Sequence, residues 1–443
     1  MSLSLYDSKT ATIRAFEPIT AGKVDIYVCG PTVQSAPHVG HLRSAVAFDI
    51  IANWLRIGHK LDVKLVRNVT DIDDKILVNA KEQGKEWREL AVEVETIFNS
   101  VYQSIGAEVE HRPHATAHID GMIAIIERLI ARGHAYQAEG SANVFFDTAS
   151  WQGYGELTRQ KLENMEGEAI GGGRRAAHDF ALWKAAKAGE PETAAWDSPW
   201  GRGRPGWHIE CSAMTFAEFG EAFDIHGGGL DLRFPHHENE LAQSRAAGYS
   251  FANYWMHNGL VTVSGQKMSK SLGNGVSVEE FFAQGSPAAV RYWLGSAHYR
   301  STLDYSPSAI AEAEAALTRV TNYLSRNPSA AGELPKAFAE AMDSDFNVPA
   351  ALGVLHDTIR AGNSGDAGAA AQVAAMAAVL GIEATVAEAS DELAAKVEAL
   401  LEERKVARAN KDFSRSDSIR DELNQLGVTI EDTANGTTWS ING

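Results

Sequence analysis

The fold of this chain is decided by the stretch Val24-Asp25-Ile26-Tyr27-Val28, which runs directly into Cys29-Gly30-Pro31. The apolar run predicts a buried strand, and the glycine and prolines after it predict a loop from Gly30 to Val39. Apolar residues then recur at helical spacing from Gly40 to Ile57, and a second strand is predicted over Leu61 to Val66. This order of strand, helix and strand predicts a Rossmann-like α/β domain with a parallel sheet, which binds ligands at the carboxyl ends of its strands.

The rest of the chain divides by composition. Glycine, charge and tryptophan dominate from about Gly133 to Arg204, which predicts an insertion that splits the α/β domain. Alanine-rich helical sequence begins at Ser306 and predicts a helical bundle. The predicted units are the first half of the α/β domain (1–132), a connective insertion (133–204), the second half of that domain (205–305), the helical bundle (306–388) and a small C-terminal module (389–443).

Composition narrows the class of protein. No run approaches the roughly 18 apolar residues of a membrane span, and the first residues lack an export signal, so we expect a cytoplasmic protein without a membrane role. The formal net charge of −18 argues against a general nucleic-acid binder but leaves room for a local basic surface. The 2 cysteines are expected to be reduced thiols.

Those two cysteines are candidate metal ligands. Cys29 follows the first strand, and Cys211 precedes the segment Phe234-Pro235-His236-His237-Glu238-Asn239-Glu240. Thiolates, an imidazole and a carboxylate are donors that zinc accepts. His236 and Glu240, four residues apart, share one face of a helix, and His237 with Glu240 is also compatible with the spacing. The alternatives are buried cysteines that only fill the core, or a purely structural zinc closed by four protein ligands.

Two further motifs indicate nucleotide chemistry. His38-Val39-Gly40-His41 opens the predicted helix, whose N-terminus offers free N–H groups to phosphate. Lys267-Met268-Ser269-Lys270-Ser271 lies between glycines, which is typical of a mobile loop that brings positive charge to a triphosphate during reaction. Either motif alone is weak, but together and in this order they predict an ATP site.

With these motifs the chain resembles the cysteinyl-tRNA synthetase family of class I aminoacyl-tRNA synthetases. The resemblance covers nearly the whole chain, from the first strand to about Ile441. It is carried by segments 27–32, 67–76, 206–211, 227–231, 234–240 and 343–349, besides the two ATP motifs. The chain departs from many relatives at Gln34 and Ser35, where those carry tyrosine and aspartate.

The resemblance implies a role for each matching residue. It implies one Zn²⁺ per chain, which binds the thiol of substrate cysteine and so excludes serine. It also implies ATP with Mg²⁺ as substrate and a cysteinyl-adenylate intermediate. The implied zinc ligands are Cys29, Cys211, His236 and Glu240. The implied ATP-handling residues are His38, Gly40, His41, Lys267 and Lys270, and the implied cysteine contacts are Gly30, Thr32, Thr70, Trp207 and Asp231.

The resemblance also implies that the C-terminal module binds the anticodon of tRNA(Cys) and that the enzyme is a monomer. Basic residues in this module fall three or four apart and could line one helix face toward phosphates, or could pair with neighbouring acids. They are Arg404, Lys405, Arg408, Lys411, Arg415 and Arg420. Two rival functions remain open. One is the mycothiol-pathway ligase that joins cysteine to glucosaminyl-inositol, and the other is a non-catalytic zinc protein that binds RNA.

Overall fold

The structure is a computed structural model that describes residues 2–165, 167, 170–263, 265–268, 276–383, 391–426, 428–433 and 436–441. At its centre lies a four-stranded sheet in the order β10-β9-β3-β4, parallel throughout. Its strands are β3 (Lys23–Val28), β4 (Asp62–Arg67), β9 (Ala222–Gly229) and β10 (Phe251–Asn258). Because Val28 pairs with both Arg67 and Gly227, three strand ends meet at one edge of the sheet. The predicted parallel α/β core is confirmed.

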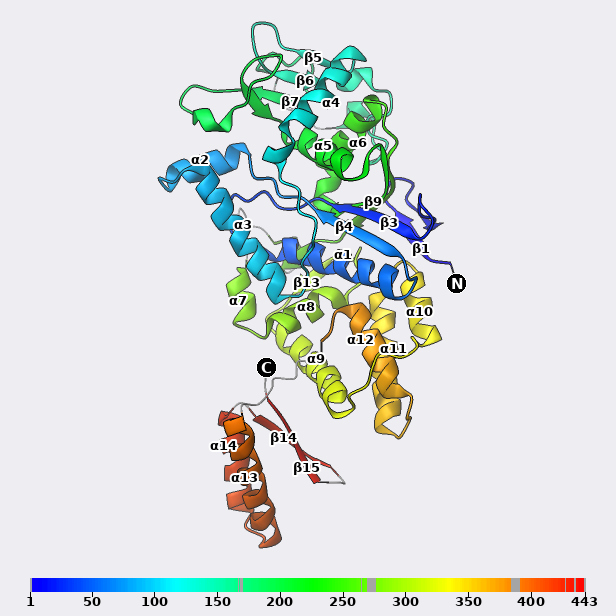
Figure 1. Ribbon diagram of the computed structural model, residues 1–443, viewed down its shortest axis with the longest axis vertical. Helices are drawn as coiled ribbons and strands as arrows, with labels where there is room; N and C mark the ends of the chain where they lie inside the picture. Colours follow the sequence, from blue (N-terminus) through cyan, green and yellow to red (C-terminus); the bar gives the residue numbers. More distant parts are fainter. Residues whose placement is uncertain are drawn as a thin grey trace.

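Helix α1 (Val39–Ile57) follows β3 and covers one face of this sheet (Figure 1). Twelve of its residues are buried, among them Phe48 and Trp54, which explains the helical spacing of apolar residues in the sequence. The helix packs against the sheet and against α8 and α12 of the second half of the chain. It therefore joins the sheet to the helical part of the molecule.

The remaining elements of the first half flank the sheet. A hairpin of β1 (Ser4–Asp7) and β2 (Thr12–Ala15) leads into β3. After β4 come α2 (Asp74–Glu82), α3 (Trp87–Ser104), the 3₁₀ turn η1 (Ala115–His118) and α4 (Ile119–Ala131).

The insertion contains a second, antiparallel sheet that the sequence analysis did not predict. Its order is β5-β6-β7-β8. The strands are β5 (Ala135–Gln137), β6 (Val144–Phe146), β7 (Phe180–Ala185) and β8 (Gly203–Pro205), with 3₁₀ turns η2 (Thr148–Ser150), η3 (Leu162–Asn164) and η4 (Glu192–Ala194) between them.

Ion pairs attach the insertion to the first half of the α/β domain. The guanidinium of Arg204 on β8 is buried and contacts the carboxylates of Asp74 on α2 and Glu190, and Lys184 donates to Asp74 at 2.9 Å. These contacts hold the pKa of the Asp74 carboxyl below its usual value, although burial acts in the opposite direction. The insertion is therefore held to α2 as well as to the helices α4 and α5 (Trp207–Phe219), which precede and follow it and contact its strands.

The second half of the α/β domain carries the helices nearest the strand ends. They are α5 (Trp207–Phe219), the turn η5 (Leu230–Leu232), a short π-helix η6 (Arg233–His237) and α6 (Glu238–Ala246). A small sheet in the order β12-β11-β13 follows, made of β11 (Val261–Val263), β12 (Gln266–Lys267) and β13 (Leu303–Tyr305), with α7 (Val278–Phe282) and α8 (Pro287–Ser296) between β12 and β13.

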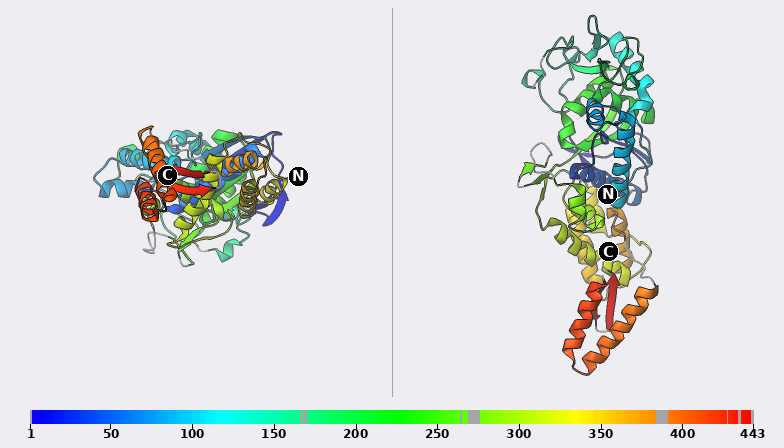
Figure 2. Two further views of the ribbon diagram at one scale, coloured as in Figure 1. Left: turned by 90° about the horizontal axis from the view of Figure 1, so that it is seen from below. Right: turned by 90° about the vertical axis from the view of Figure 1, so that its left-hand side faces the viewer.

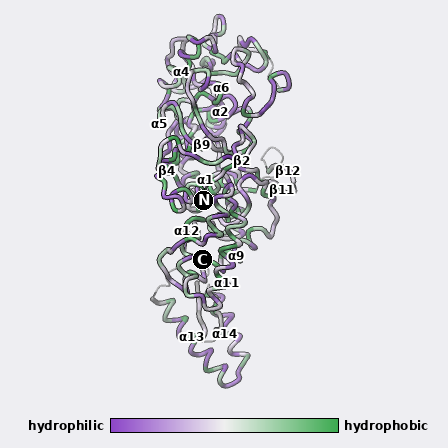
Figure 3. Tube along the Cα trace, turned by 90° about the vertical axis from the view of Figure 1, so that its right-hand side faces the viewer, coloured by the Kyte–Doolittle hydropathy of each residue, from purple (hydrophilic) through white to green (hydrophobic). Residues whose placement is uncertain are grey.

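After β13, the described residues form mainly helices, apart from a terminal hairpin. The bundle comprises α9 (Ala309–Arg326), α10 (Lys336–Asp343), α11 (Val348–Asn363) and α12 (Ala369–Leu380). The C-terminal module comprises α13 (Asp391–Ala409), α14 (Phe413–Gln425), β14 (Val428–Thr433) and β15 (Gly436–Ile441). Insertion and module lie at opposite ends of the long axis (Figure 2), and hydrophilic residues recur along both module helices (Figure 3). The exact domain boundaries stay predictions.

Among the described residues, no helix combines the length and the apolar character that crossing a membrane requires.

Two glycines test this packing in opposite directions. Gly353 lies exposed within α11, and an added Cβ would meet nothing within 4 Å. Because glycine costs about 0.5–1 kcal/mol relative to alanine inside a helix, we expect Gly353→Ala to stabilise the bundle by that amount.

At Gly227 on β9 a Cβ would lie 2.3 Å from the ring of Phe48, so Gly227→Ala should destabilise the protein. Denaturant unfolding followed by circular dichroism measures both, and equal shifts would contradict the packing described.

Candidate metal centre and active-site cavity

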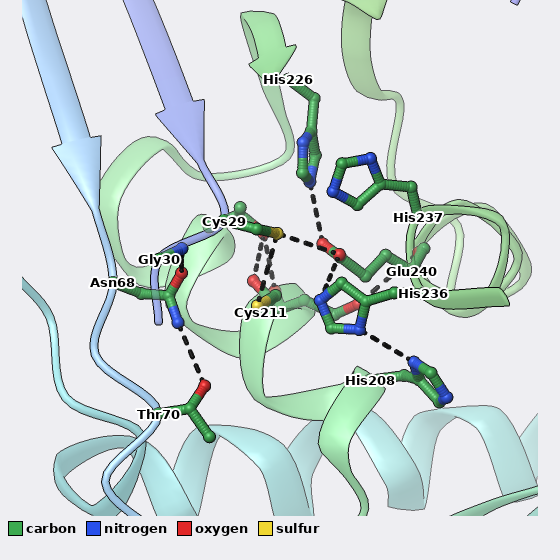
Figure 4. Close-up of polar contacts among 12 residues, drawn as sticks. Cys29, Gly30, Asn68, Thr70, His208, Cys211, His226, His236, His237 and Glu240 are labelled. Atoms are coloured by element: carbon green, nitrogen blue, oxygen red, sulfur yellow. Dashed lines mark hydrogen bonds and ion pairs between the residues drawn. The ribbon is translucent and has the colours of Figure 1, made fainter. Parts of the chain in front are cut away.

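The four side chains predicted as metal ligands lie together at the carboxyl edge of the central sheet (Figure 4). The Sγ atoms of Cys29 and Cys211 are 3.8 Å apart, and Cys29 Sγ is 3.4 Å from Glu240 Oε1. His236 Nε2 is 3.0 Å from the same carboxylate oxygen. One donor atom from each of the four lies within 4.8 Å of the others. Two sulfurs, one imidazole and one carboxylate at this separation form a donor set that fits zinc.

Three separate elements bring these ligands together. Cys29 directly follows β3, and its amide donates to Gly227 O on β9 at 3.1 Å. Cys211 lies in the second turn of α5, and His236 and Glu240 lie at the junction of η6 and α6. The i, i+4 pair of the sequence analysis is thus His236 with Glu240. His237 points instead to His257, with Nδ1 and Nε2 2.9 Å apart.

Burial favours the uncharged forms of the two thiols and of His236. Desolvation, with a contribution from Cys211, raises the pKa of Cys29 well above its usual value, and desolvation also raises the pKa of Cys211. Burial lowers the pKa of His236 well below that of a free histidine. A buried cation would reverse this preference for the thiols, because metal ligation requires thiolates.

Several polar residues that the sequence analysis did not name surround the four ligands. His226 Nε2 lies 2.9 Å from Glu240 Oε2, and His208 Nδ1 lies 3.0 Å from His236 Nδ1. Asn68 accepts from the amide of Gly30 at 2.8 Å and donates to Thr70 Oγ1 at 3.3 Å. His208 and Asn68 lie within segments 206–211 and 67–76, which carry the resemblance, so these segments could have indicated them as site residues. His226 directly precedes Gly227-Gly228-Gly229, a weaker signal.

The insertion contacts the segment that carries His236 and Glu240. The carboxylate of Glu238, 1% exposed, accepts from the amide of Gly155 at 2.9 Å and from the amide and hydroxyl of Thr158 at 2.8 and 2.9 Å. Tyr154 donates its hydroxyl to Asn239 at 2.5 Å. Loop 154–158 therefore fixes the start of α6 between the two ligands.

A cavity of about 740 Å³ opens beside the metal ligands. Its lining includes Cys29, Gly30, Thr32, Trp207 and Asp231, which the resemblance implies as ligand or cysteine contacts. The indole of Trp207 stacks on His236 with ring centroids 4.0 Å apart and an interplanar angle of 23°. Thr70 does not line the cavity, because it is 1% exposed and bridges to Thr32 behind the loop.

His38, Gly40 and His41 line the same cavity at the start of α1. His38 caps the helix, since its Nδ1 accepts from the amide of Gly40 at 3.1 Å, and His41 Nδ1 accepts from the amide of His38 at 3.2 Å. The two imidazoles stack with centroids 3.8 Å apart. A Cβ at Gly40 would lie 2.9 Å from the His38 ring, which explains the glycine. The backbone amide of Gly40, which the sequence analysis expected to face a phosphate, therefore donates its hydrogen bond to His38 in this structure.

The second ATP motif is described only in part. Lys267 ends β12, and Met268 lines the cavity. Lys270 lies outside the described residues. The described residues resume at Val276, and Ser277 forms an antiparallel bridge with His38. Both ends of the motif loop therefore border the cavity that holds the His38–His41 motif.

In the C-terminal module, several of the basic residues pair with acids. Lys405 contacts Glu402 at 3.1 Å and Arg415 contacts Glu403 at 2.8 Å, while Arg404 is 3% exposed. Trp439 packs on the core of the module and donates Nε1 to Glu398 at 2.9 Å. Phe413, at the start of α14, is 65% exposed.

This architecture is that of the class I aminoacyl-tRNA synthetases. A solved structure of Mycobacterium tuberculosis methionyl-tRNA synthetase in complex with methionyl-adenylate superposes with a TM-score of 0.56. It covers 81% of this chain and 88% of that chain at 16% identity, so it shows the fold alone. The family described as "tRNA synthetases class I (C) catalytic domain" matches residues 15–315.

Further matches define the family more closely. The DALR domain matches residues 337–386, and the "Cysteinyl-tRNA ligase anticodon binding domain" matches residues 390–439. Among curated relatives, the cysteine–tRNA ligases of Clavibacter sepedonicus and Micrococcus luteus are 55% and 51% identical, with 100% of this chain and 100% of each relative covered. The chain belongs to the cysteine–tRNA ligase family and is an enzyme of that family.

The donor set generates a prediction about metal content. We expect the purified chain to carry about one equivalent of zinc, and Cys29→Ala to lose it, because three donors in a dry site leave the ion undercoordinated. His134→Asn, a histidine of the insertion that bonds Ser150, should retain the metal and serves as control. Elemental analysis after gel filtration measures the metal content. Full zinc in Cys29→Ala would contradict the site.

Proposed function

We propose that this enzyme attaches L-cysteine to tRNA(Cys) in two steps through a cysteinyl-adenylate. The observation that carries the proposal is the shared cavity, in which Cys29 and Trp207 beside the metal ligands lie with His38 and His41 at the start of α1. One cavity can therefore hold an amino acid by its side chain and a nucleotide by its phosphates. Such a reaction depends chiefly on positioning and charge stabilisation.

We propose Zn²⁺ as the resident ion of the donor set Cys29, Cys211, His236 and Glu240. Two thiols, a carboxylate and an imidazole, all fully buried or nearly so and mutually within 4.8 Å, fit a zinc ion. When bound, the ion supplies affinity for a thiolate over a hydroxyl, which distinguishes cysteine from serine. Cys29 borders the cavity, so a substrate thiol can approach this set from there.

The cavity residues orient the rest of the amino acid. Trp207 forms a flat wall against His236, and Gly30 leaves room beside Cys29. A Cβ at Gly30 would lie 1.7 Å from the carbonyl oxygen of Asn68, so this position requires glycine. Asp231 and Thr32 offer polar groups to the amino and carboxyl end of cysteine. Thr70, which is buried, acts by holding Asn68 and the loop at Thr32.

ATP with Mg²⁺ occupies the other part of the cavity in this proposal. The cysteine carboxylate attacks the α-phosphate, and pyrophosphate leaves. His38, Gly40 and His41 contact the nucleotide, and Lys267 and Lys270 bring charge to the leaving phosphates. A ribose hydroxyl at the end of the tRNA then takes the cysteinyl group from the adenylate, and AMP leaves.

The C-terminal module supports tRNA as the acceptor. Its match to an anticodon-binding domain over residues 390–439 favours tRNA over the amino sugar of the mycothiol-pathway ligase. The ATP motifs argue against a non-catalytic RNA-binding protein. A monomeric, cytoplasmic enzyme with the unit boundaries of the sequence analysis completes the proposal.

Cysteine-dependent ATP–pyrophosphate exchange tests the role of the thiol ligands. We expect Cys211→Ser to raise the KM for cysteine by at least about tenfold and to leave the KM for ATP within about twofold, since the hydroxyl is a poor zinc ligand. The full chain with tRNA(Cys) and with glucosaminyl-inositol as acceptors then identifies the product. Equal losses for both substrates would show that the metal is only architectural.

The loop lysine is tested by rate rather than affinity. Lys270→Ala should lower kcat of the exchange reaction by about 10²–10³, the usual effect of removing one charge-stabilising donor, with little change in the KM for cysteine. Lys336→Ala, on the exposed surface of α10, is the matched control and should leave both constants unchanged. An unchanged rate in Lys270→Ala would remove the loop from the mechanism.

A further inference from the structure

Two overlapping sets of donors surround Glu240, and both could hold a metal ion. Cys29 and Glu240 belong to both sets. The first set adds Cys211 and His236, and the second adds His226 and His237. In each set the donor atoms lie within 4.8 Å of one another, and all of these side chains are buried. The sets differ in chemistry, because the first offers two thiolates and the second only one.

The two added histidines of the second set retain unused nitrogen atoms. In the described part of the chain, His226 Nδ1 and His237 Nε2 are buried and have no hydrogen-bond partner. The His226 ring stacks on Trp255 with centroids 4.5 Å apart, and its Nε2 already faces Glu240. The donors of the second set are therefore close enough to bind an ion, and His237 has a partner in His257, whereas His226 Nδ1 has none in the described part of the chain.

The first set differs in how its histidine is held. His236 points Nε2 toward Glu240 Oε1 at 3.0 Å and Nδ1 toward His208 Nδ1 at 3.0 Å, as Figure 4 shows. The His208 ring meets the edge of Phe180 at 5.5 Å and 82°, and its backbone carbonyl accepts from Gln243 at 3.0 Å. His208 is thus itself fixed by the insertion on one side and by α6 on the other.

We propose that His208 is a positioning residue that selects the two-thiolate set over the competing set with His226 and His237. A ligating histidine needs a partner on its second nitrogen, which fixes the tautomer and the ring orientation. With Nε2 of His236 on the ion, its proton lies on Nδ1 and is donated to Nδ1 of His208. This inference rests on the proposed metal site.

The selection matters for substrate specificity. Soft thiolate ligands favour an ion that accepts a further sulfur, whereas nitrogen and oxygen ligands are less selective. An ion in the second set would be bound by Cys29 but not by Cys211, which does not belong to that set. His208 therefore contributes to the choice of cysteine without touching it.

Cobalt substitution of the full chain tests the proposal, because thiolate-to-cobalt absorption scales with the number of bound thiolates. We expect the unaltered chain to show the intensity of two thiolates. His208→Phe should show about half of that intensity and bind Co²⁺ about 10–100-fold more weakly. His208→Asn, whose side-chain oxygen lies close to the place of Nδ1, should restore most of both.

A second substitution identifies the competing set. His237→Asn should leave the two-thiolate spectrum unchanged alone, and should remove the remaining cobalt binding in the His208→Phe background. His134→Asn is the control for a general loss of stability, with folding checked by circular dichroism. If His208→Phe does not fold, His208→Gln displaces the acceptor by one methylene and should give the same halved intensity.

The outcomes separate the two proposals. If the unaltered chain shows fewer than two thiolates on cobalt, the proposed metal site is wrong. If the unaltered chain shows two and a folded His208→Phe or His208→Gln also shows two at unchanged affinity, the metal site stands and the role of His208 is overturned.

Discussion

The register of β3 between β4 and β9 is the constraint on which the rest of the structure depends. Val28 pairs with Arg67 on one side and Gly227 on the other, and the amide of Cys29 continues this ladder to Gly227 O. Parallel strands end at one edge, so the first thiol is placed by backbone hydrogen bonds rather than by a flexible loop. A slip of one residue would turn Cys29 to the other face of the sheet and dismantle the donor set.

The segment that carries His236 and Glu240 is held by contacts with residues that are distant in the sequence. Glu238, between His236 and Glu240, is bound by loop 154–158 of the insertion, and the insertion is in turn held to α2 through Arg204 and Asp74. The insertion is therefore not an appendage to the α/β domain. It connects α2, which follows β4, to α6, which carries Glu240 at the strand edge.

Sequence reasoning predicted the elements whose signals are long and periodic. The strand at 24–28 and the helix at 40–57 follow from spacing and agree with the structure. The sheet of the insertion was missed because three of its four strands are only 3 residues long, too short for a period to emerge. Spacing could not choose between His236 and His237 as the partner of Glu240, whereas the structure pairs His236 with Glu240 at 3.0 Å. That choice depends on His257 and His208, which approach from other elements.

The histidines around the donor set limit the net charge of the proposed metal centre. In the proposed site, a divalent cation held by Cys29, Cys211 and Glu240 as anions would leave a single excess negative charge, and a substrate thiolate would add another. A further carboxylate partner on His236 would raise this cost in a medium of low dielectric constant. The partner is instead His208, and burial lowers the pKa of His208 and of His257 to about 3. Neutral imidazoles orient the proposed ligands by hydrogen bonds and add no charge, so they would leave the proposed centre able to accept one more thiolate.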